Sequence, residues 1–257
     1  MNQKPNIAIF KEPKGLIKVI ELGITIFAFA TVAGFIGRFN FKVNCLKGGR
    51  MRPVDAVFYY PFNNVTLKAT SPCENETRDD LEKFTSEIDY RSEAEYFVFT
   101  GVTSMLFVLV AAGYYVFFED RAKDATSTDV GLFSFPVVDF VFTIVLVIFW
   151  FTSSIAWAAG FSGLKKATSQ ENVFKAYPAC TGQSGITRCE PSTFQGAVYG
   201  APLIAVILGF LNFFVWGGNL WFLFKETPWH SPRSSGMKGG EIPQQEPPHQ
   251  EIPPSAI

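Results

Sequence analysis

The stretch that decides the fold is Tyr96–Phe118, "YFVFTGVTSMLFVLVAAGYYVFF", which contains no Asp, Glu, Lys or Arg. An uncharged apolar run of about 20 residues is long enough to cross a hydrocarbon core roughly 30 Å thick, and helices of soluble proteins are rarely buried over such a length. In lipid the backbone must satisfy its own hydrogen bonds, which a helix does. This stretch therefore predicts a transmembrane helix.

Three further blocks have the same character. Val19–Gly37 has one charge, Glu21, while Phe140–Leu164 and Pro191–Phe224 have none. The predicted spans are residues 16–37, 96–118, 137–159 and 202–224. The sequence predicts an all-α membrane protein with a four-helix bundle, and the lack of a basic stripe argues against a nucleic-acid partner. The first block could also be a signal peptide cleaved near Ala30, but its apolar run continues through Thr31 to Gly37.

Four spans place both ends of the chain on one side of the membrane. The segments there are a polar arm, residues 1–15, and a Pro-rich tail, residues 228–257, whose composition predicts disorder. Two loops, residues 38–95 and 160–195, lie on the other side, and the membrane domain covers residues 16–227. Lys and Arg are spread too evenly around the spans to orient the protein.

Cysteines and glycosylation patterns indicate the orientation. All four cysteines lie in the two loops, the second pair within "CTGQSGITRC" at Cys180–Cys189. The first loop also carries N-x-T patterns at Asn64 and Asn75, both candidate glycosylation sites. Disulfides and N-glycans belong to oxidising compartments, so we expect lumenal loops and cytosolic tails.

The chemistry of the cysteines follows from this orientation. A metal site would need Cys-x-x-Cys spacing or a nearby His, but both histidines, His230 and His249, lie in the opposite compartment. Pairing within each loop, Cys45 with Cys73 and Cys180 with Cys189, is the favoured prediction. A bridge between the loops and free thiols remain open alternatives.

The spans contain few polar residues and no catalytic constellation. Glu21 and Asp139 lie near the cytosolic starts of their spans, which predicts a place at the headgroup boundary rather than an ion or proton role. In the fourth span Asn212 and Asn219 share a helix face. A ladder of small residues joins them there: Ala201, Ala205 and Gly209. These residues predict helix packing within the bundle, or self-assembly of several copies.

Several motifs resemble the synaptophysin family of MARVEL-domain vesicle proteins. They are "FKEPKGLIKVIE" at 10–21, "SEAEYFVF" at 92–99, "SSIAWAAGFSGLKKAT" at 153–168 and "GFLNFFVWGGNLWFLFKETPW" at 209–229. The resemblance implies a non-enzymatic protein of synaptic or small secretory vesicles. It implies homo-oligomers, affinity for cholesterol-rich membrane with cholesterol as a possible bound lipid, and association with synaptobrevin in exocytosis. It also implies the two intraloop disulfides and glycosylation of the first loop.

The tail departs from synaptophysin proper because it has no tyrosine. Tyrosine-based regulation and the choice of family member are therefore doubtful. The alternative function is an oligomeric pore, with Asn212, Asn219, Glu21 or Asp139 facing water, although uninterrupted spans argue against it. The loops lack the cysteine and tryptophan patterns of connexins and claudins. The larger loop comes first here, whereas in tetraspanins the larger loop lies between the third and fourth spans.

Overall fold

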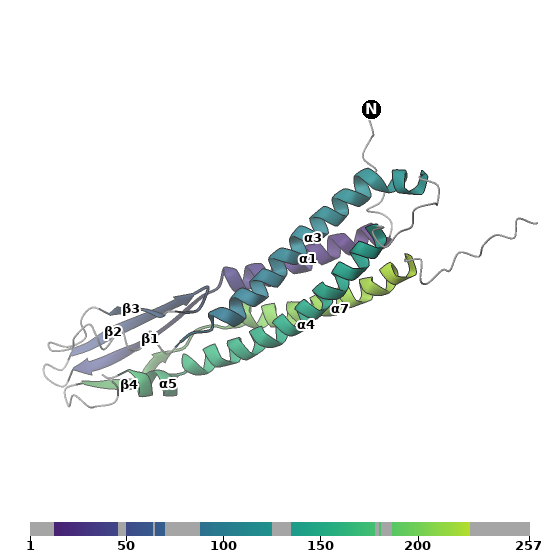
Figure 1. Cartoon of the computed structure of the whole chain (residues 1–257). Helices are drawn as coiled ribbons and strands as arrows, with labels where there is room; N and C mark the ends of the chain where they lie inside the picture. The colour runs from purple at the N-terminus through teal and green to yellow at the C-terminus, as the bar shows by residue number, and fades with distance from the viewer. Residues whose placement is uncertain are drawn as a thin grey trace, which may run out of the picture.

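The computed structural model describes residues 13–45, 50–63, 65–69, 88–124, 135–177, 180 and 187–226. These residues form a bundle of long helices with a small β-sheet at one end (Figure 1). The four long helices are α1 (Pro13–Ala33), α3 (Arg91–Asp124), α4 (Phe135–Ala167) and α7 (Gly200–Glu226). By length and composition each of them can cross a membrane, as the sequence predicts.

The helices are arranged as a ring in which α1 packs on α3 and α7, and α4 packs on the same two helices. α1 leads directly into the sheet, and the last strand leads directly into α7. The start of α1 and the end of α7 therefore lie at the end of the bundle away from the sheet. Below, this is called the tail end.

All four helices differ from the predicted spans at both ends, and two of these differences change the fold. α1 ends at Ala33 and the first strand starts at Ile36, so the predicted first span runs too far. α4 continues to Ala167 and is followed by a short helix, α5 (Gln170–Ala176), where the sequence predicted only loop. At 1.5 Å per residue α3 and α4 are about 50 Å long, so both extend well beyond a hydrocarbon core of about 30 Å.

The two predicted lumenal loops contribute strands to one sheet, so the predicted all-α class is wrong. The strands are β1 (Ile36–Cys45), β2 (Arg50–Tyr59), β3 (Val65–Ala69) and β4 (Thr187–Gln195). Their order is β3-β2-β1-β4, and every neighbouring pair is antiparallel. β4 comes from the second loop and pairs with β1 from the first, so backbone hydrogen bonds hold the two loops together.

The sheet forms because β1 alternates apolar and polar side chains. Phe39, Phe41 and Val43 are buried, while Arg38 before them and Lys42 between the last two are exposed. This period of two gives a strand one face for a core and one face for water. The buried face packs against α5, where Phe174 and Tyr177 contact Phe41 edge-on.

An aromatic cluster joins the sheet to the bundle. Phe62, which follows β2, is fully buried with its backbone in the left-handed region at φ 65°. Its ring lies 5.6 Å from that of Trp157 on α4 and 6.1 Å from that of Phe35 at the end of α1. Tyr199, just before α7, contacts Phe35 and hydrogen-bonds Thr168 after α4. Sheet and helices thus share one hydrophobic core.

Several predictions fall on residues outside the described part of the chain. They are the disordered tail, glycosylation at Asn64 and Asn75, and the pairing of Cys45 with Cys73. Of that pair, only the backbone of Cys45 is described, at the end of β1. These features stay predictions.

Candidate functional site

A cluster of polar side chains lies inside the bundle near its tail end. On α1, Lys18 and Glu21 are one helical turn apart, and Lys18 Nζ lies 3.3 Å from Glu21 Oε2. The same Nζ lies 3.6 Å from Oδ1 of Asp139 on α4. All three side chains are buried, with 3% of Lys18 exposed and none of either acid. One ammonium group thus bridges two carboxyl groups in an apolar interior.

Hydroxyl groups from α3 and α4 complete the surroundings of Asp139. Tyr115 Oη donates a hydrogen bond of 2.8 Å to Asp139 Oδ2, and Thr143 Oγ1 lies 3.4 Å from Oδ1. Asp139 therefore has two hydroxyl donors, in addition to its ion pair with Lys18. A buried carboxyl group is costly unless donors satisfy its oxygens, and these two hydroxyl groups supply such donors.

α7 adds the fourth side of the cluster. Asn219 Nδ2 donates a hydrogen bond of 2.7 Å to Glu21 Oε1. Lys18 Nζ also lies over two aromatic rings, 5.4 Å from the centroid of Trp216 and 5.6 Å from that of Phe107. Cation–π contacts of this kind are stronger when water is excluded. All four long helices therefore contribute side chains to this one cluster.

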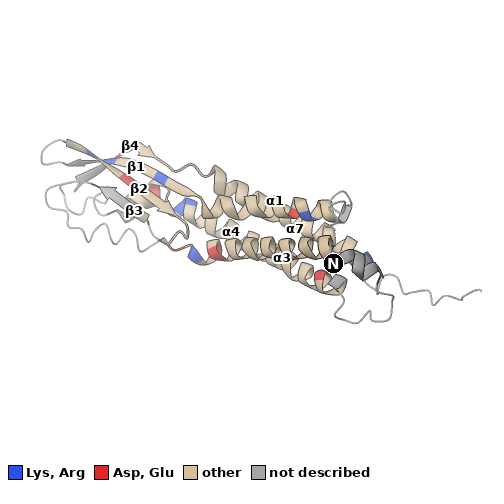
Figure 2. Cartoon of the chain, turned by 90° about the horizontal axis from the view of Figure 1, so that it is seen from above, with Lys and Arg blue, Asp and Glu red and all other residues tan. Residues whose placement is uncertain are grey.

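Glu21 and Asp139 lie inside the bundle, and their predicted depth at the headgroup boundary stays a prediction. Asp139 is the fifth residue of α4, so its position along the helix is near the end, as expected. Both side chains nevertheless face the bundle interior, because the ion pairs with Lys18 offset part of their desolvation. In Figure 2 the coloured ribbon segments that mark charged residues are sparse along most of the bundle and lie mainly near its two ends.

Sequence reasoning missed Lys18, Tyr115 and Thr143 as parts of this cluster. In the sequence Lys18 resembles one of the Lys and Arg residues that flank the spans. Its spacing of three residues from Glu21, on one face of a helix that must cross lipid, was a usable signal. Nothing in the sequence indicates that Asp139, on another helix, shares the same ammonium group.

A second polar contact joins α1 to α7 nearer the middle of the bundle. Thr25 Oγ1 donates a hydrogen bond of 3.0 Å to Asn212 Oδ1, and both side chains are fully buried. Asn212 Nδ2 donates in turn to the Leu208 carbonyl. The shared face of Asn212 and Asn219 therefore points at α1 of the same chain.

The small residues of α7 permit a close approach to α3 and α4. Ala205 and Gly209 are buried, and Ala201 is half-buried. A Cβ added at Gly209 would lie 2.4 Å from Ser154 Oγ on α4 and 2.7 Å from the ring of Phe97 on α3. Glycine is thus required here for packing within one chain. A role of these residues in self-assembly remains a prediction.

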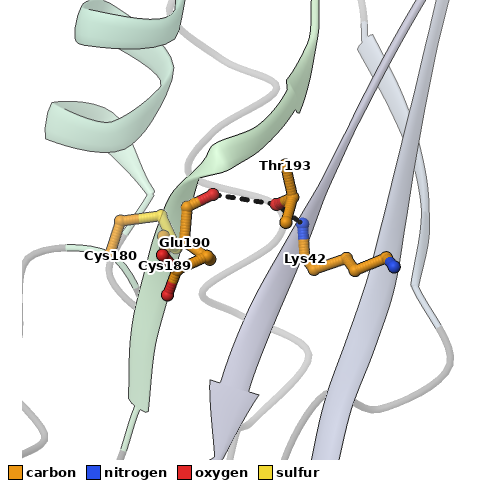
Figure 3. The surroundings of a disulfide bond; sticks show 5 residues. All are labelled: Lys42, Cys180, Cys189, Glu190 and Thr193. Atoms are coloured by element: carbon orange, nitrogen blue, oxygen red, sulfur yellow. Dashed lines mark hydrogen bonds between the residues drawn. A yellow bond between two sulfur atoms is a disulfide. The ribbon is translucent and has the colours of Figure 1, made fainter.

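A disulfide between Cys180 and Cys189 attaches the segment after α5 to β4, as predicted. Its Cα atoms are 4.8 Å apart, within the usual range. Figure 3 shows it beside two hydrogen bonds, in which the Lys42 amide donates to Thr193 Oγ1 and Thr193 Oγ1 donates to the Glu190 carbonyl. The disulfide connects β4 to the segment after α5, and the hydrogen bond from Lys42 connects β4 to β1.

No group of three or more His, Cys, Asp and Glu side chains comes together as metal ligands among the described residues. The buried cluster has only two acids, and Lys18 occupies the space between them. Its arrangement is suited to holding helices together and to binding a proton.

These features define a multi-pass membrane protein with four spans and an extramembrane sheet closed by a disulfide. Residues 9–222 match the model of the MARVEL family, described as the membrane-associating domain. The match covers most of the chain, so the protein belongs to the MARVEL family.

Proposed function

We propose that this MARVEL protein is a non-enzymatic organiser of synaptic or small secretory vesicle membranes, of the synaptophysin type. In this proposal it assembles into homo-oligomers in cholesterol-rich membrane and binds synaptobrevin through helix faces within the bilayer, and so contributes to exocytosis. The motifs at 153–168 and 209–229, which resemble the synaptophysin family, support the assignment.

The observation that carries the proposal is the contrast between the inside and the outside of the bundle. Inside, the polar groups of the buried cluster are paired with partners from the same chain. Outside, large apolar side chains are exposed, among them Phe27 on α1, Val110 on α3 and Phe214 on α7. A bundle that is filled inside and apolar outside is suited to binding lipid and other membrane helices.

The orientation belongs to the same proposal. The Cys180–Cys189 disulfide lies on the sheet side, and disulfides persist in oxidising compartments. We therefore assign the sheet to the vesicle lumen, with the tail end of the bundle, the polar arm and the Pro-rich tail on the cytosolic side.

The pore alternative is less well supported. It requires Asn212, Asn219, Glu21 or Asp139 to face water, but all four side chains are buried between helices of one chain. Their hydrogen bonds and ion pairs link α1 to α4 and α7. A water-filled path lined by them would require the bundle to open.

The test is recovery of synaptobrevin with the tagged full-length protein from secretory cells, solubilised in a mild, cholesterol-retaining detergent. Recovery that is lost in a harsher detergent is the expected result. Two outward-facing variants locate the contact, Phe214→Ala on α7 and Val110→Ala on α3, of which the one on the binding face should reduce recovery. Absence of synaptobrevin while the protein remains intact and oligomeric would contradict the proposal.

A further inference from the structure

The buried cluster has unbalanced charge if both of its acids are ionised. Lys18 carries one positive charge, whereas Glu21 and Asp139 together would carry two negative charges. In the described part of the chain, no second cation pairs with either carboxyl group. The other described groups in contact with the cluster are neutral: Tyr115 and Phe107 from α3, Thr143 from α4, and Asn219 and Trp216 from α7. A net negative charge in an apolar interior is strongly unfavourable.

The hydrogen bonds indicate which acid would carry a compensating proton. Asp139 accepts hydrogen bonds from two hydroxyl groups, those of Tyr115 and Thr143. Glu21 has a donor, Asn219, at Oε1 only. Lys18 Nζ lies 3.3 Å from Glu21 Oε2 and 3.6 Å from Asp139 Oδ1, so the ammonium group is shared by the two acids and does not distinguish them. Donors stabilise the ionised form, so the negative charge belongs on Asp139 and the proton on Glu21.

We propose that this cluster is a proton-binding site, in which the Glu21 carboxyl group holds one proton while the Lys18 ammonium group balances the charge of Asp139. The proton comes from water at the tail end and converts the Glu21 carboxylate into a carboxylic acid, with no other bond made or broken. The occupied site is electrically neutral and joins all four helices. Release of the proton leaves a net negative charge between α1 and α4, which weakens the packing at this end of the bundle.

The test is infrared spectroscopy of the full-length protein in lipid nanodiscs near neutral pH. A protonated carboxyl group has a carbonyl stretching band that is distinct from that of a carboxylate and shifts in heavy water. The wild type should show one such buried band. Glu21→Gln, which keeps the shape of the side chain and its contact with Asn219, should abolish it. The exposed acid Glu95 provides the matched control, and Glu95→Gln should leave the band unchanged.

Asp139→Asn distinguishes charge balance from simple burial. In this variant Lys18 is left with Glu21 alone, so Glu21 should ionise and the band should disappear. If burial alone kept Glu21 protonated, the band would remain in Asp139→Asn and the charge-balance explanation would be wrong. A wild type without the band, or a band that persists in Glu21→Gln, would overturn the site itself.

A third variant, Lys18→Met, should increase the band instead of removing it. Without the ammonium group both acids should be neutral, and the band should grow to about twice its wild-type intensity because two carboxyl groups contribute. An unchanged band in the folded variant would contradict the proposal. If this variant does not fold, the two amide variants still decide the question, since both preserve side-chain shape.

Discussion

Asn219 on the last helix donates a hydrogen bond of 2.7 Å to Glu21 on the first, although nearly the whole chain separates them. The same carboxyl group pairs with Lys18, which reaches Asp139 on α4. Tyr115 on α3 completes the ring through its bond to Asp139. The tail end of the bundle is thus held by one connected set of polar side chains, whose removal should weaken several helix contacts together.

We expect Asn219→Leu to lower the thermal stability of the bundle. The substitution leaves Glu21 Oε1 without its donor, at a cost of about 1–2 kcal/mol for a buried group that loses a hydrogen-bond partner. Thermal unfolding in detergent, followed by circular dichroism, measures the effect. The matched control is Phe222→Leu, an outward-facing change on the same helix. Equal melting temperatures for the two variants would show that the Asn219–Glu21 bond contributes nothing.

The bond between Thr25 and Asn212 should appear as a coupling energy in a double-mutant cycle. We expect Thr25→Val and Asn212→Leu each to destabilise the protein, and the double variant to lose less than their sum. In membranes such coupling averages about 0.6 kcal/mol and reaches about 1.7 kcal/mol. Strictly additive effects would mean that the two side chains do not interact in the folded protein.

Gly209→Ala should destabilise the bundle, because its added methyl group would overlap Ser154 Oγ and the ring of Phe97. Forcing extra volume into a packed core typically costs about 1–3 kcal/mol. Gly217→Ala on the same helix is the control, since nothing lies within 4 Å of its added Cβ. Unfolding temperatures and oligomer size should both be recorded. A smaller oligomer with an unchanged unfolding temperature would instead assign Gly209 to self-assembly.

Removal of the disulfide should loosen the sheet region and leave the spans folded. By the chain-entropy estimate, closing a loop of this length stabilises the folded state by about 2.7 kcal/mol. We expect Cys180→Ser combined with Cys189→Ser to speed hydrogen exchange in α5 and β4, while exchange in α4 and α7 stays slow. Wild-type exchange rates in β4 of this variant would show that the strand pairing with β1 is sufficient without the disulfide.

The sequence by itself determined the four spans, the family resemblance and the pairing of Cys180 with Cys189 as the favoured choice. These follow from local properties: the length of each apolar run, and the gathering of all cysteines in two loops. The strand pattern of Phe39, Phe41 and Val43 was also readable from the sequence, but it was overlooked beside the stronger signal of the spans.

The tertiary structure alone decided how distant segments meet. β1 and β4 are far apart in the sequence but pair in the sheet, because α1 and α7 pack side by side and bring both strands to the same end of the bundle. Lys18, Glu21 and Asp139 each resemble a flanking charge when the spans are considered one at a time. In the folded protein these charges cannot reach water, so pairing with one another is their most favourable state. Which charges can pair depends on which helices are neighbours.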